Sequence, residues 1–323
     1  MKIIEVNNLS KEYKYFEKTE GLKGAVKSLF KRETKIKRAL TDFSFSMEEG
    51  EFVGLMGPNG AGKTTLIKLL TGIIQPTEGT AVVNGFDPFK GESAFKKSFA
   101  VVMGQKSQLW WDLPASDSLL LNKAIYEISD KQYQENLDYF SRIFEVEKHL
   151  SIPVRKLSLG ERMKFELIAA LLHTPKLLFL DEPTIGLDAV AQRQIREMLK
   201  VAGQERGISL LLTSHYTEDL LELTKRCLVM RGGQKIYDGD LKTLLADHST
   251  FSTIEIVFSE PKEIPNLPGV EIIGQGDCTL SVRTPKDEVE VCLKQLLSLS
   301  DIADIKISDD DVTLLVERVY KSA

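Results

Sequence analysis

A glycine-rich stretch from Gly57 to Thr64 carries the clearest chemical signal in the sequence. It consists of Gly57, Pro58, Asn59, Gly60, Ala61, Gly62, Lys63 and Thr64, and it matches the pattern G-x-x-x-x-G-K-T. Glycines allow the backbone to curl so that successive N–H groups point at anionic oxygens. A lysine at this spacing reaches the β- and γ-phosphates of a nucleoside triphosphate, and the adjacent threonine hydroxyl binds Mg²⁺. The stretch, together with Thr65, therefore predicts a nucleotide-binding loop.

The residues on either side of this loop predict the elements that position it. The run Glu51–Met56 before it is short and apolar, as in a buried strand. After it, Leu66, Leu69, Leu70 and Ile73 recur at helical spacing. The N-terminus of such a helix adds partial positive charge where the phosphates would lie. Glycine-rich turns also precede helices for purely steric reasons, so the order strand, loop, helix is what favours a binding site here.

A pair of carboxylates, Asp181 and Glu182, ends the apolar run Leu177–Leu180. Such a continuous run is typical of a parallel strand covered on both faces. Asp181 beside a phosphate loop can hold Mg²⁺ through water, and Glu182 can then polarise an attacking water. Acidic residues also end strands and cap the next element without a catalytic role. Their position at the tip of the most apolar run favours metal binding and base catalysis.

The segment Leu157–Glu161 predicts a second helix N-terminus. Ser158 can cap this helix, and Glu161, three residues later, can complete a capping box. A helix N-terminus with a free serine and a glycine, here Gly160, is also a phosphate receptor. One chain hardly needs two receptors for one γ-phosphate, so the two interpretations stay open at this point.

Length and composition place the chain among ordinary globular proteins. Its 323 residues are comfortable for two domains, and the net charge of −5 gives no indication of nucleic-acid binding. The three cysteines have no metal-ligand spacing and fit a reducing cytosol. No window approaches the roughly 18 apolar residues of a membrane helix, so we expect any membrane-spanning part to belong to another chain.

Hydrophobic periodicity predicts strands that alternate with helices, and hence a mostly parallel sheet with crossover helices. Met1–Phe16 begins like an edge strand, and Leu109–Tyr139 like one helix with an early break at Pro114. Cys227–Tyr237 predicts a hairpin that turns at two glycines. From about Thr250 the pattern changes to that of a small α+β unit with a split βαβ arrangement.

The motifs follow one another in the order of the nucleotide-binding subunits of ATP-binding cassette transporters, a family that the chain resembles from about Met1 to Asp240. The matching residues are Tyr13 for the aromatic that stacks on adenine, Gly57–Thr64 for Walker A, Gln105 for the Q-loop, Leu157–Glu161 for the signature LSGGQ, Leu177–Glu182 for Walker B, Gly186–Asp188 for the D-loop and Thr213–His215 for the switch-histidine loop.

The resemblance implies an α/β fold, that of a P-loop NTPase cassette. It implies a mostly parallel sheet core, an antiparallel β subdomain and a helical subdomain, with a small C-terminal α+β domain. We expect the ATP-binding domain at residues 1–245, its helical subdomain at about 106–175, and the accessory domain at 250–323.

The resemblance also implies the ligands and the roles of the site residues. ATP and Mg²⁺ bind, with Thr64, Gln105 and Asp181 near the metal. Two cassettes pair head to tail, so each ATP lies between Walker A of one chain and the signature of the other. The catalytic residues are Glu182 as general base, His215, which would steady the γ-phosphate and the attacking water, and Gln105, which would sense Mg²⁺ and the membrane partner. Ser158 and Gly160 act across the dimer, and Asp188 of the D-loop is among the residues expected to bind the nucleotide.

Several residues depart from the family pattern. Leu159 stands where the signature usually has glycine, Glu161 replaces glutamine, and Gly104 replaces a proline before Gln105. The segment Lys14–Arg38 is unusually long and contains a basic amphipathic stretch, Gly21–Arg32. This stretch is either a solvated helix docked on its own domain or a contact with a membrane surface or a membrane partner.

Trp110 and Trp111 follow Gln105, in the region where the family docks a coupling helix of its partner. They face either that partner or the core.

These features predict an ATPase subunit that powers a separately encoded membrane permease, similar to the ABC-2-type exporters of bacteria. We expect it in the cytoplasm, peripheral on the inner face of the cell membrane, as a homodimer or paired cassette and with no nucleic-acid partner. The alternatives are a non-transport cassette ATPase that acts on ribosomes or DNA, and a module that binds ATP without hydrolysing it. Intact Glu182 and His215 speak against the latter.

Overall fold

The computed structural model describes residues 1–16, 34–104, 106–214, 216–261, 270–299 and 301–309. The chain divides into two compact units, Met1–Asp240 and Leu241–Ala323, and each is described by itself. The predicted amphipathic stretch Gly21–Arg32 lies outside the described residues. Within the described part of the chain, no helix is both long and apolar enough to cross a membrane.

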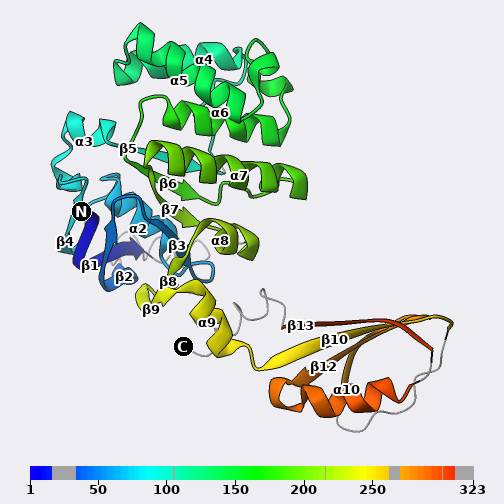
Figure 1. The fold of residues 1–323 in the computed structure, drawn as a ribbon. Coiled ribbons are helices and arrows are strands. Elements are labelled where there is room, and N and C mark those ends of the chain that lie inside the picture. The colour runs from blue at the N-terminus through cyan, green and yellow to red at the C-terminus, as the bar shows by residue number, and fades with distance from the viewer. Residues whose placement is uncertain (17–33, 105, 215, 262–269, 300, 310–323) are drawn as a thin grey trace, which may run out of the picture. The chain divides into compact units, whose positions relative to one another are not determined.

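The first unit is built on a six-stranded sheet with the order β5-β6-β7-β3-β8-β9 (Figure 1). The first five strands are parallel and β9 is antiparallel, as the predicted hairpin requires. The strands are β3 (Phe52–Met56), β5 (Phe99–Met103), β6 (Leu177–Asp181), β7 (Ser209–Thr213), β8 (Arg226–Arg231) and β9 (Gln234–Asp240). The helices that connect them include α2 (Lys63–Leu70), α7 (Ala189–Arg206) and α8 (Thr217–Leu223). The mostly parallel core sheet predicted from the alternating pattern is confirmed.

The register of this sheet brings the carboxyl ends of neighbouring strands to the same edge. Met103 of β5 lies opposite Asp181 of β6, and Asp181 lies opposite Thr213 of β7. Thr213 in turn lies opposite Leu55 of β3, one residue before that strand ends. The segments that leave four neighbouring strands therefore start at one edge of the sheet, which is where open α/β sheets bind ligands.

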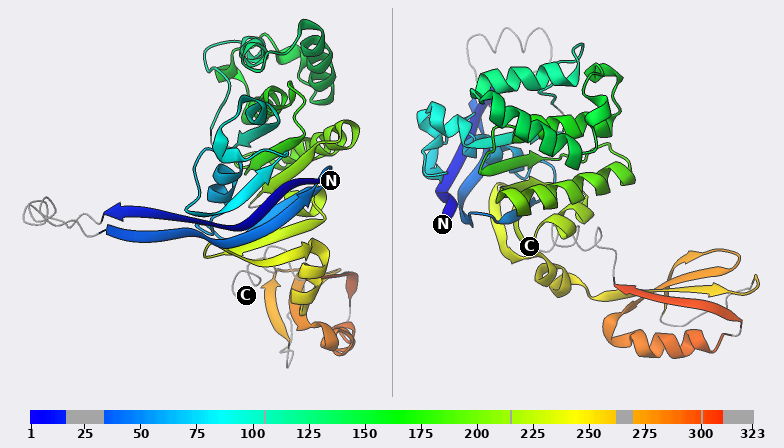
Figure 2. Two further views of the ribbon diagram at one scale, coloured as in Figure 1. Left: turned by 90° about the vertical axis from the view of Figure 1, so that its left-hand side faces the viewer. Right: turned by 45° about the horizontal axis from the view of Figure 1, so that its top comes forward.

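A second, antiparallel sheet has the order β2-β1-β4, with β1 (Lys2–Phe16), β2 (Thr34–Glu48) and β4 (Glu78–Val83). The prediction of an edge strand for the N-terminus is wrong, because β4 pairs with the other side of β1, for example Val83 with Ile4. Strands β1 and β2 form a ribbon that extends well past the rest of this unit (Figure 2, left).

The helical region contains α4 (Ala115–Tyr126), α5 (Asp130–Ile143) and α6 (Leu159–Leu171). The prediction of one helix over Leu109–Tyr139 is wrong. Glu127 adopts a left-handed conformation with φ 54° and ends α4, and the Ser129 side chain accepts from the Gln132 N–H to begin α5. These local signals interrupt a pattern whose apolar periodicity continues across the break. Shorter helical turns in the first unit are Pro88–Lys90, α3 (Ser93–Lys97), Glu147–His149 and Val154–Lys156.

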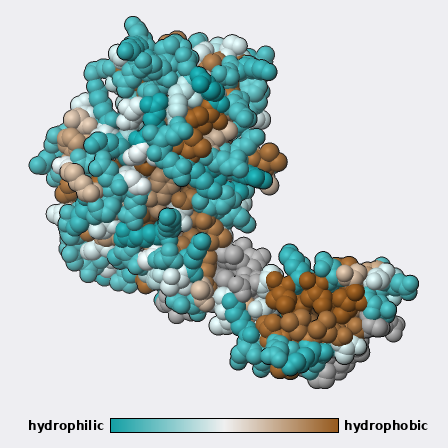
Figure 3. All heavy atoms as spheres, in the orientation of Figure 1, coloured by the Kyte–Doolittle hydropathy of each residue, from teal (hydrophilic) through white to brown (hydrophobic). Residues whose placement is uncertain are grey.

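The second unit begins with α9 (Leu241–His248) and continues with a four-stranded antiparallel sheet of order β11-β12-β10-β13. Its strands are β10 (Phe251–Phe258), β11 (Glu271–Gln275), β12 (Thr279–Pro285) and β13 (Ile302–Asp309), and a short turn Lys286–Glu288 leads into α10 (Val289–Leu297). Both β12 and β13 are antiparallel to the strand between them, β10, so β12-α10-β13 is the predicted split βαβ arrangement. Apolar side chains gather on the face of this unit seen in Figure 3.

All three cysteines have free thiols, and Cys227 and Cys292 are buried. Burial raises the pKa of Cys227 to about 12, with a smaller contribution from the negative charges of Asp240 and Asp238. Because the thiolate is the reactive form, Cys227 is an inert core residue.

Candidate nucleotide-binding site

The predicted loop leaves β3 and enters α2 with a backbone that only glycine allows at two of its positions. Gly57 and Gly62 have φ of 150° and 109°, and a Cβ on either would lie within 2.5 Å of a backbone oxygen, that of Met230 or of Ala39. Gly60 also has a positive φ, 81°, but its Cβ side is open. The loop thus packs tightly against the protein at Gly57 and Gly62 and is open at Gly60. Its curled backbone can receive an anion on the open side.

Lys63 is the first residue of α2, and only 7% of its surface is exposed. Its Nζ donates to the carbonyl oxygens of Gly57 at 2.5 Å and Pro58 at 3.2 Å. Burial lowers the pKa of Lys63, and the charges of Glu182 and Asp181 act in the opposite direction. The ammonium thus spans the inside of the loop, where its positive charge is only partly compensated.

A cavity of about 550 Å³ lies over this loop. Its lining combines the loop with the ribbon and includes Tyr13, Tyr15, Lys37, Ala39, Asn59, Gly60, Ala61, Gly62, Lys63, Thr64, Thr65 and Glu182. Tyr13 is 38% exposed, and the Nζ of Lys11 lies 5.3 Å from its ring centroid. One ring face is therefore near a cation, and the side chain still borders the cavity.

Tyr15, Lys37 and Ala39 were not predicted as site residues. Tyr15 follows Tyr13 by two positions, so both side chains lie on the same face of β1, and Lys37 pairs with Tyr13 across the ribbon. The alternation along β1 was the signal that could have identified Tyr15. Lys37 depends on the pairing of β1 with β2, which the sequence does not reveal.

A carboxylate at the end of β6 connects that strand to β7 and to the first turn of α2. Asp181 Oδ2 accepts from Thr64 Oγ1 at 3.1 Å, and its Oδ1 accepts from Thr213 Oγ1 at 2.6 Å. A second cavity of about 150 Å³ lies here, lined by Thr64, Lys68, Met103, Gly104, Lys106, Asp181 and Glu182. Oxygen donors of this kind suit Mg²⁺, which keeps several waters and needs only one or two protein ligands. The described residues hold no group of three or more His, Cys, Asp or Glu side chains arranged for a metal.

Glu182 borders both cavities and has an unusual backbone. Its φ is 56°, in the left-handed region that non-glycine residues rarely occupy. Its N–H donates to the carbonyl oxygen of Thr213 at 3.0 Å and lies 3.1 Å from the Thr213 hydroxyl. Residues held in such conformations cluster at functional sites, and here the neighbouring strand holds the strain in place.

Gly104 explains one departure from the family pattern. A Cβ at this position would lie 2.1 Å from the carbonyl oxygen of Glu182, and the Gly104 N–H donates to the Asp181 carbonyl at 2.9 Å. The backbone after β5 therefore packs directly on the backbone of the predicted catalytic residue.

We expect Gly104→Ala to lower ATP turnover about tenfold or more with ATP binding largely retained, because a displacement of about 1 Å at a reacting group can cost about 10²-fold. Steady-state hydrolysis and a binding titration would measure the two effects separately. Gly274→Ala is the matched control, since its nearest neighbour lies 3.5 Å from the added Cβ. Unchanged turnover in Gly104→Ala would show that this contact does not position Glu182.

Gln105 and His215 lie outside the described residues. Their described neighbours follow β5 and β7, the two strands on either side of β6.

The predicted signature residues lie elsewhere in the chain. Ser158 is exposed and caps α6, and Glu161 completes the predicted capping box: its Oε2 accepts from the Ser158 N–H and hydroxyl, both at 2.8 Å. Burial acts to raise the pKa of Glu161, but these hydrogen bonds and the nearby His149 and Lys164 outweigh it, so the pKa lies below its usual value.

Neither Ser158 nor Gly160 lines the two cavities described above. Leu159 packs beside Gly186, since its Cδ2 lies 3.3 Å from where a Cβ at Gly186 would be. Asp188 is exposed and caps α7, accepting from the Ala191 N–H at 2.9 Å.

The two tryptophans of the helical region are exposed. Trp110 is 57% and Trp111 is 52% exposed, and Leu113 beside them is 43% exposed. The guanidinium of Arg162 lies 5.2 Å from the Trp111 ring centroid. The interpretation of these tryptophans as core residues is wrong.

Comparison with known proteins identifies the family. The family model for ABC transporters matches residues 40–185. The ABC transporter ATP-binding protein NatA of Bacillus subtilis is 30% identical over 215 residues, which cover 67% of this chain and 87% of NatA. The Nod factor export ATP-binding protein I of Rhizobium leguminosarum bv. viciae is 31% identical over 257 residues, covering 78% and 81%.

Solved structures show the same fold. The ATP-binding subunit of an ABC transporter superposes with a TM-score of 0.62 at 26% identity, covering 76% of this chain and 92% of that one. The dimeric cassette MJ0796, bound to ADP and Pi, gives 0.60 at 22% identity, covering 74% and 98%. The cassette fold predicted from the ordered motifs is thus confirmed, and this chain belongs to the ABC transporter family as an ATP-binding and ATP-hydrolysing subunit.

Proposed function

We propose that this chain hydrolyses ATP to power export through a separately encoded membrane permease. The observation that carries the proposal is the meeting of Thr64, Asp181 and Glu182 between two cavities over the phosphate loop. This is the arrangement that phosphoryl transfer to water needs, since catalysis there consists of positioning and charge stabilisation.

In this proposal the loop N–H groups and Lys63 bind the phosphates, while Tyr13 stacks on the adenine. Glu182 accepts a proton from the attacking water. Mg²⁺, held by Thr64, by Gln105 and through water by Asp181, would neutralise charge on the β- and γ-phosphates. The role proposed for His215 is to steady the γ-phosphate and the attacking water.

Two copies are proposed to share each ATP. The exposed N-terminus of α6, with Ser158 and Gly160, does not line the cavity of its own chain. This exposed N-terminus is proposed to bind the γ-phosphate held by a second copy, and Asp188 lies in the segment proposed to meet that copy. The dimeric form of MJ0796 supports this arrangement.

The exposed patch of Trp110, Trp111 and Leu113 is the proposed contact with the permease. Large exposed apolar patches on a globular protein mark interaction sites, and the relatives named for Nod factor export support export as the direction. We propose that the protein lies in the cytoplasm, against the inner face of the membrane.

We expect a tagged chain, purified from detergent-solubilised membranes, to retain an integral-membrane protein. Replacing both tryptophans by alanine should remove that protein from the eluate, because the patch loses most of its apolar area. Val291→Ala with Leu297→Ala, two positions of similar exposure in the second unit, is the control. Recovery of ribosomes or DNA in place of a membrane protein would contradict export.

A further inference from the structure

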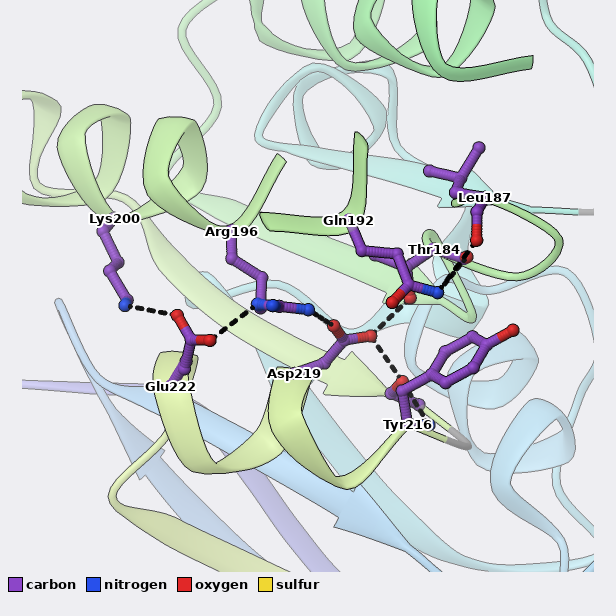
Figure 4. Close-up of polar contacts among 9 residues, drawn as sticks. Thr184, Leu187, Gln192, Arg196, Lys200, Tyr216, Asp219 and Glu222 are labelled. Carbon is purple, nitrogen blue, oxygen red and sulfur yellow. Dashed lines mark hydrogen bonds and ion pairs between the residues drawn. The ribbon is translucent and has the colours of Figure 1, made fainter. Parts of the chain in front are cut away.

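A fully buried carboxylate on α8 lies at the centre of a polar network that the proposed mechanism does not use. Asp219 has no exposed surface, and Thr184 and Ser214 beside it are 1% and 5% exposed. Figure 4 shows the side chains of Thr184 and Arg196 directed at Asp219 from two other segments of the chain.

Asp219 connects the two segments that carry the proposed catalytic side chains. Its Oδ2 accepts from Ser214 Oγ at 2.6 Å and from Thr184 Oγ1. Ser214 comes directly before His215, and Thr184 is two residues after Glu182. One carboxylate oxygen thus receives a hydroxyl from each segment.

The network extends along both segments. Ser214 Oγ accepts from the Tyr216 N–H at 3.0 Å, so the backbone on both sides of His215 is held. Gln192 Nε2 donates to the carbonyl oxygens of Thr184 at 3.4 Å and Leu187 at 3.1 Å. These contacts, drawn in Figure 4, extend the network to the residue before Asp188.

Helix α7 supplies the charge that makes a buried carboxylate tolerable. Arg196 Nη1 donates to Asp219 Oδ1 at 2.9 Å, and its Nε lies 3.1 Å from Glu222 Oε1 in an ion pair. Lys200 Nζ bonds the other oxygen of Glu222 at 3.0 Å. Burial acts to raise the pKa of Glu222, but Lys200 and Arg196 outweigh it and the pKa is lowered. The ion pairs of Glu222 with Arg196 and Lys200 therefore hold the guanidinium in place at Oδ1 of Asp219. The other oxygen, Oδ2, accepts from the two hydroxyls.

From this geometry we infer that Asp219 is a positioning residue for ATP hydrolysis, which holds the segment after Glu182 and the segment before His215 in one arrangement through Thr184 and Ser214. The inference rests on the proposed roles of Glu182 and His215. A network whose only role is to join α7 to α8 needs the Arg196–Asp219 pair alone. The two hydroxyl bonds satisfy the second oxygen of the buried carboxylate. Their donors come from the two segments that carry the proposed catalytic side chains, so they also fix both segments to one rigid group.

Removing a single hydroxyl tests this without breaking the buried ion pair. We expect Thr184→Val and Ser214→Ala each to lower kcat about 10- to 10²-fold at saturating Mg²⁺–ATP, since loss of supporting hydrogen bonds or displacement by about 1 Å has effects of this size. The Kd for ATP should stay within about threefold of its original value, because neither hydroxyl lines the cavity over the loop. The double variant should lose little more than the more affected single variant, because both act through one carboxylate.

Two further variants separate positioning from stability. Thr184→Ser keeps the hydroxyl and loses a buried methyl group, so its Tm should fall while kcat recovers to near the original value. Glu222→Gln weakens the outer ion pairs but leaves both hydroxyl bonds, so it should lower Tm with unchanged kcat. Folding of each variant is checked by circular dichroism.

Folded Thr184→Val and Ser214→Ala variants with the original kcat would overturn the inference and reduce the network to a structural joint. A kcat loss in Thr184→Ser equal to that in Thr184→Val would also overturn it. Failure of the proposed function itself has a different signature, namely normal hydrolysis by Glu182→Gln. If only the inference fails, Glu182→Gln is inactive while Thr184→Val and Ser214→Ala keep the original kcat.

Discussion

Replacing Glu182 by glutamine should lower ATP turnover by about 10²–10⁴-fold, the cost of losing a general base, while ATP remains bound. Glutamine has the size of glutamate but cannot accept the proton of the attacking water. The backbone bonds from Glu182 to Thr213 do not involve the side chain, so the strained conformation should persist. A complex that binds ATP and cannot hydrolyse it should accumulate as a dimer.

Single-turnover hydrolysis and light scattering in Mg²⁺–ATP measure these two effects. Glu135→Gln, on an exposed helix face, is the matched control and should hydrolyse ATP normally, with the same oligomeric state as the original protein. Normal hydrolysis by Glu182→Gln would exclude Glu182 as the base. Loss of hydrolysis without a trapped dimer would keep the base and contradict the sharing of ATP between two copies.

Lys63→Ala should weaken ATP binding about 10- to 100-fold. The loss of hydrogen bonds from a charged donor costs about 1.5–3 kcal/mol, and each 1.4 kcal/mol corresponds to a factor of about ten in Kd. The effect should be smaller for a nucleoside monophosphate, whose single phosphate does not reach the lysine.

Isothermal titration with ATP and with AMP provides the measurement. Lys176→Ala removes an exposed lysine and is the matched control. It should leave the affinities for ATP and for AMP unchanged. Equal ATP affinity in Lys63→Ala and the original protein would remove the basis for the phosphate-binding assignment.

The short parallel strands of the core sheet were predictable because each contains a short, continuous apolar run, a pattern typical of a buried strand. β6 and β7 each contain an uninterrupted, buried apolar run, Leu177–Leu180 and Leu210–Leu212, so length and composition alone identify them. The break between α4 and α5 was not predictable from periodicity, since it depends on the left-handed backbone of Glu127. The central place of β1 depends on β4, which lies more than sixty residues further along the chain.

The site divides in the same way. The phosphate loop is one continuous stretch of sequence, and Asp181 and Glu182 are neighbours in another. Residue types and spacing within each stretch are therefore enough to predict it. Other contacts join distant residues. Thr213 Oγ1 bonds Asp181 from 32 residues away, and the carboxylate of Asp219 accepts from Thr184 Oγ1, 35 residues earlier in the chain. Such contacts depend on the register of neighbouring strands and on helix packing, for which a single sequence has no local signal.

The capping box of α6 has a further consequence for how two copies meet. The N–H and hydroxyl of Ser158, the groups proposed to receive a neighbour's γ-phosphate, are already bonded to the carboxylate of Glu161. The low pKa of Glu161 keeps that carboxylate charged near neutral pH. Each chain therefore supplies an internal competitor for the incoming phosphate, and joining the copies exchanges one anion for another rather than filling a vacant receptor.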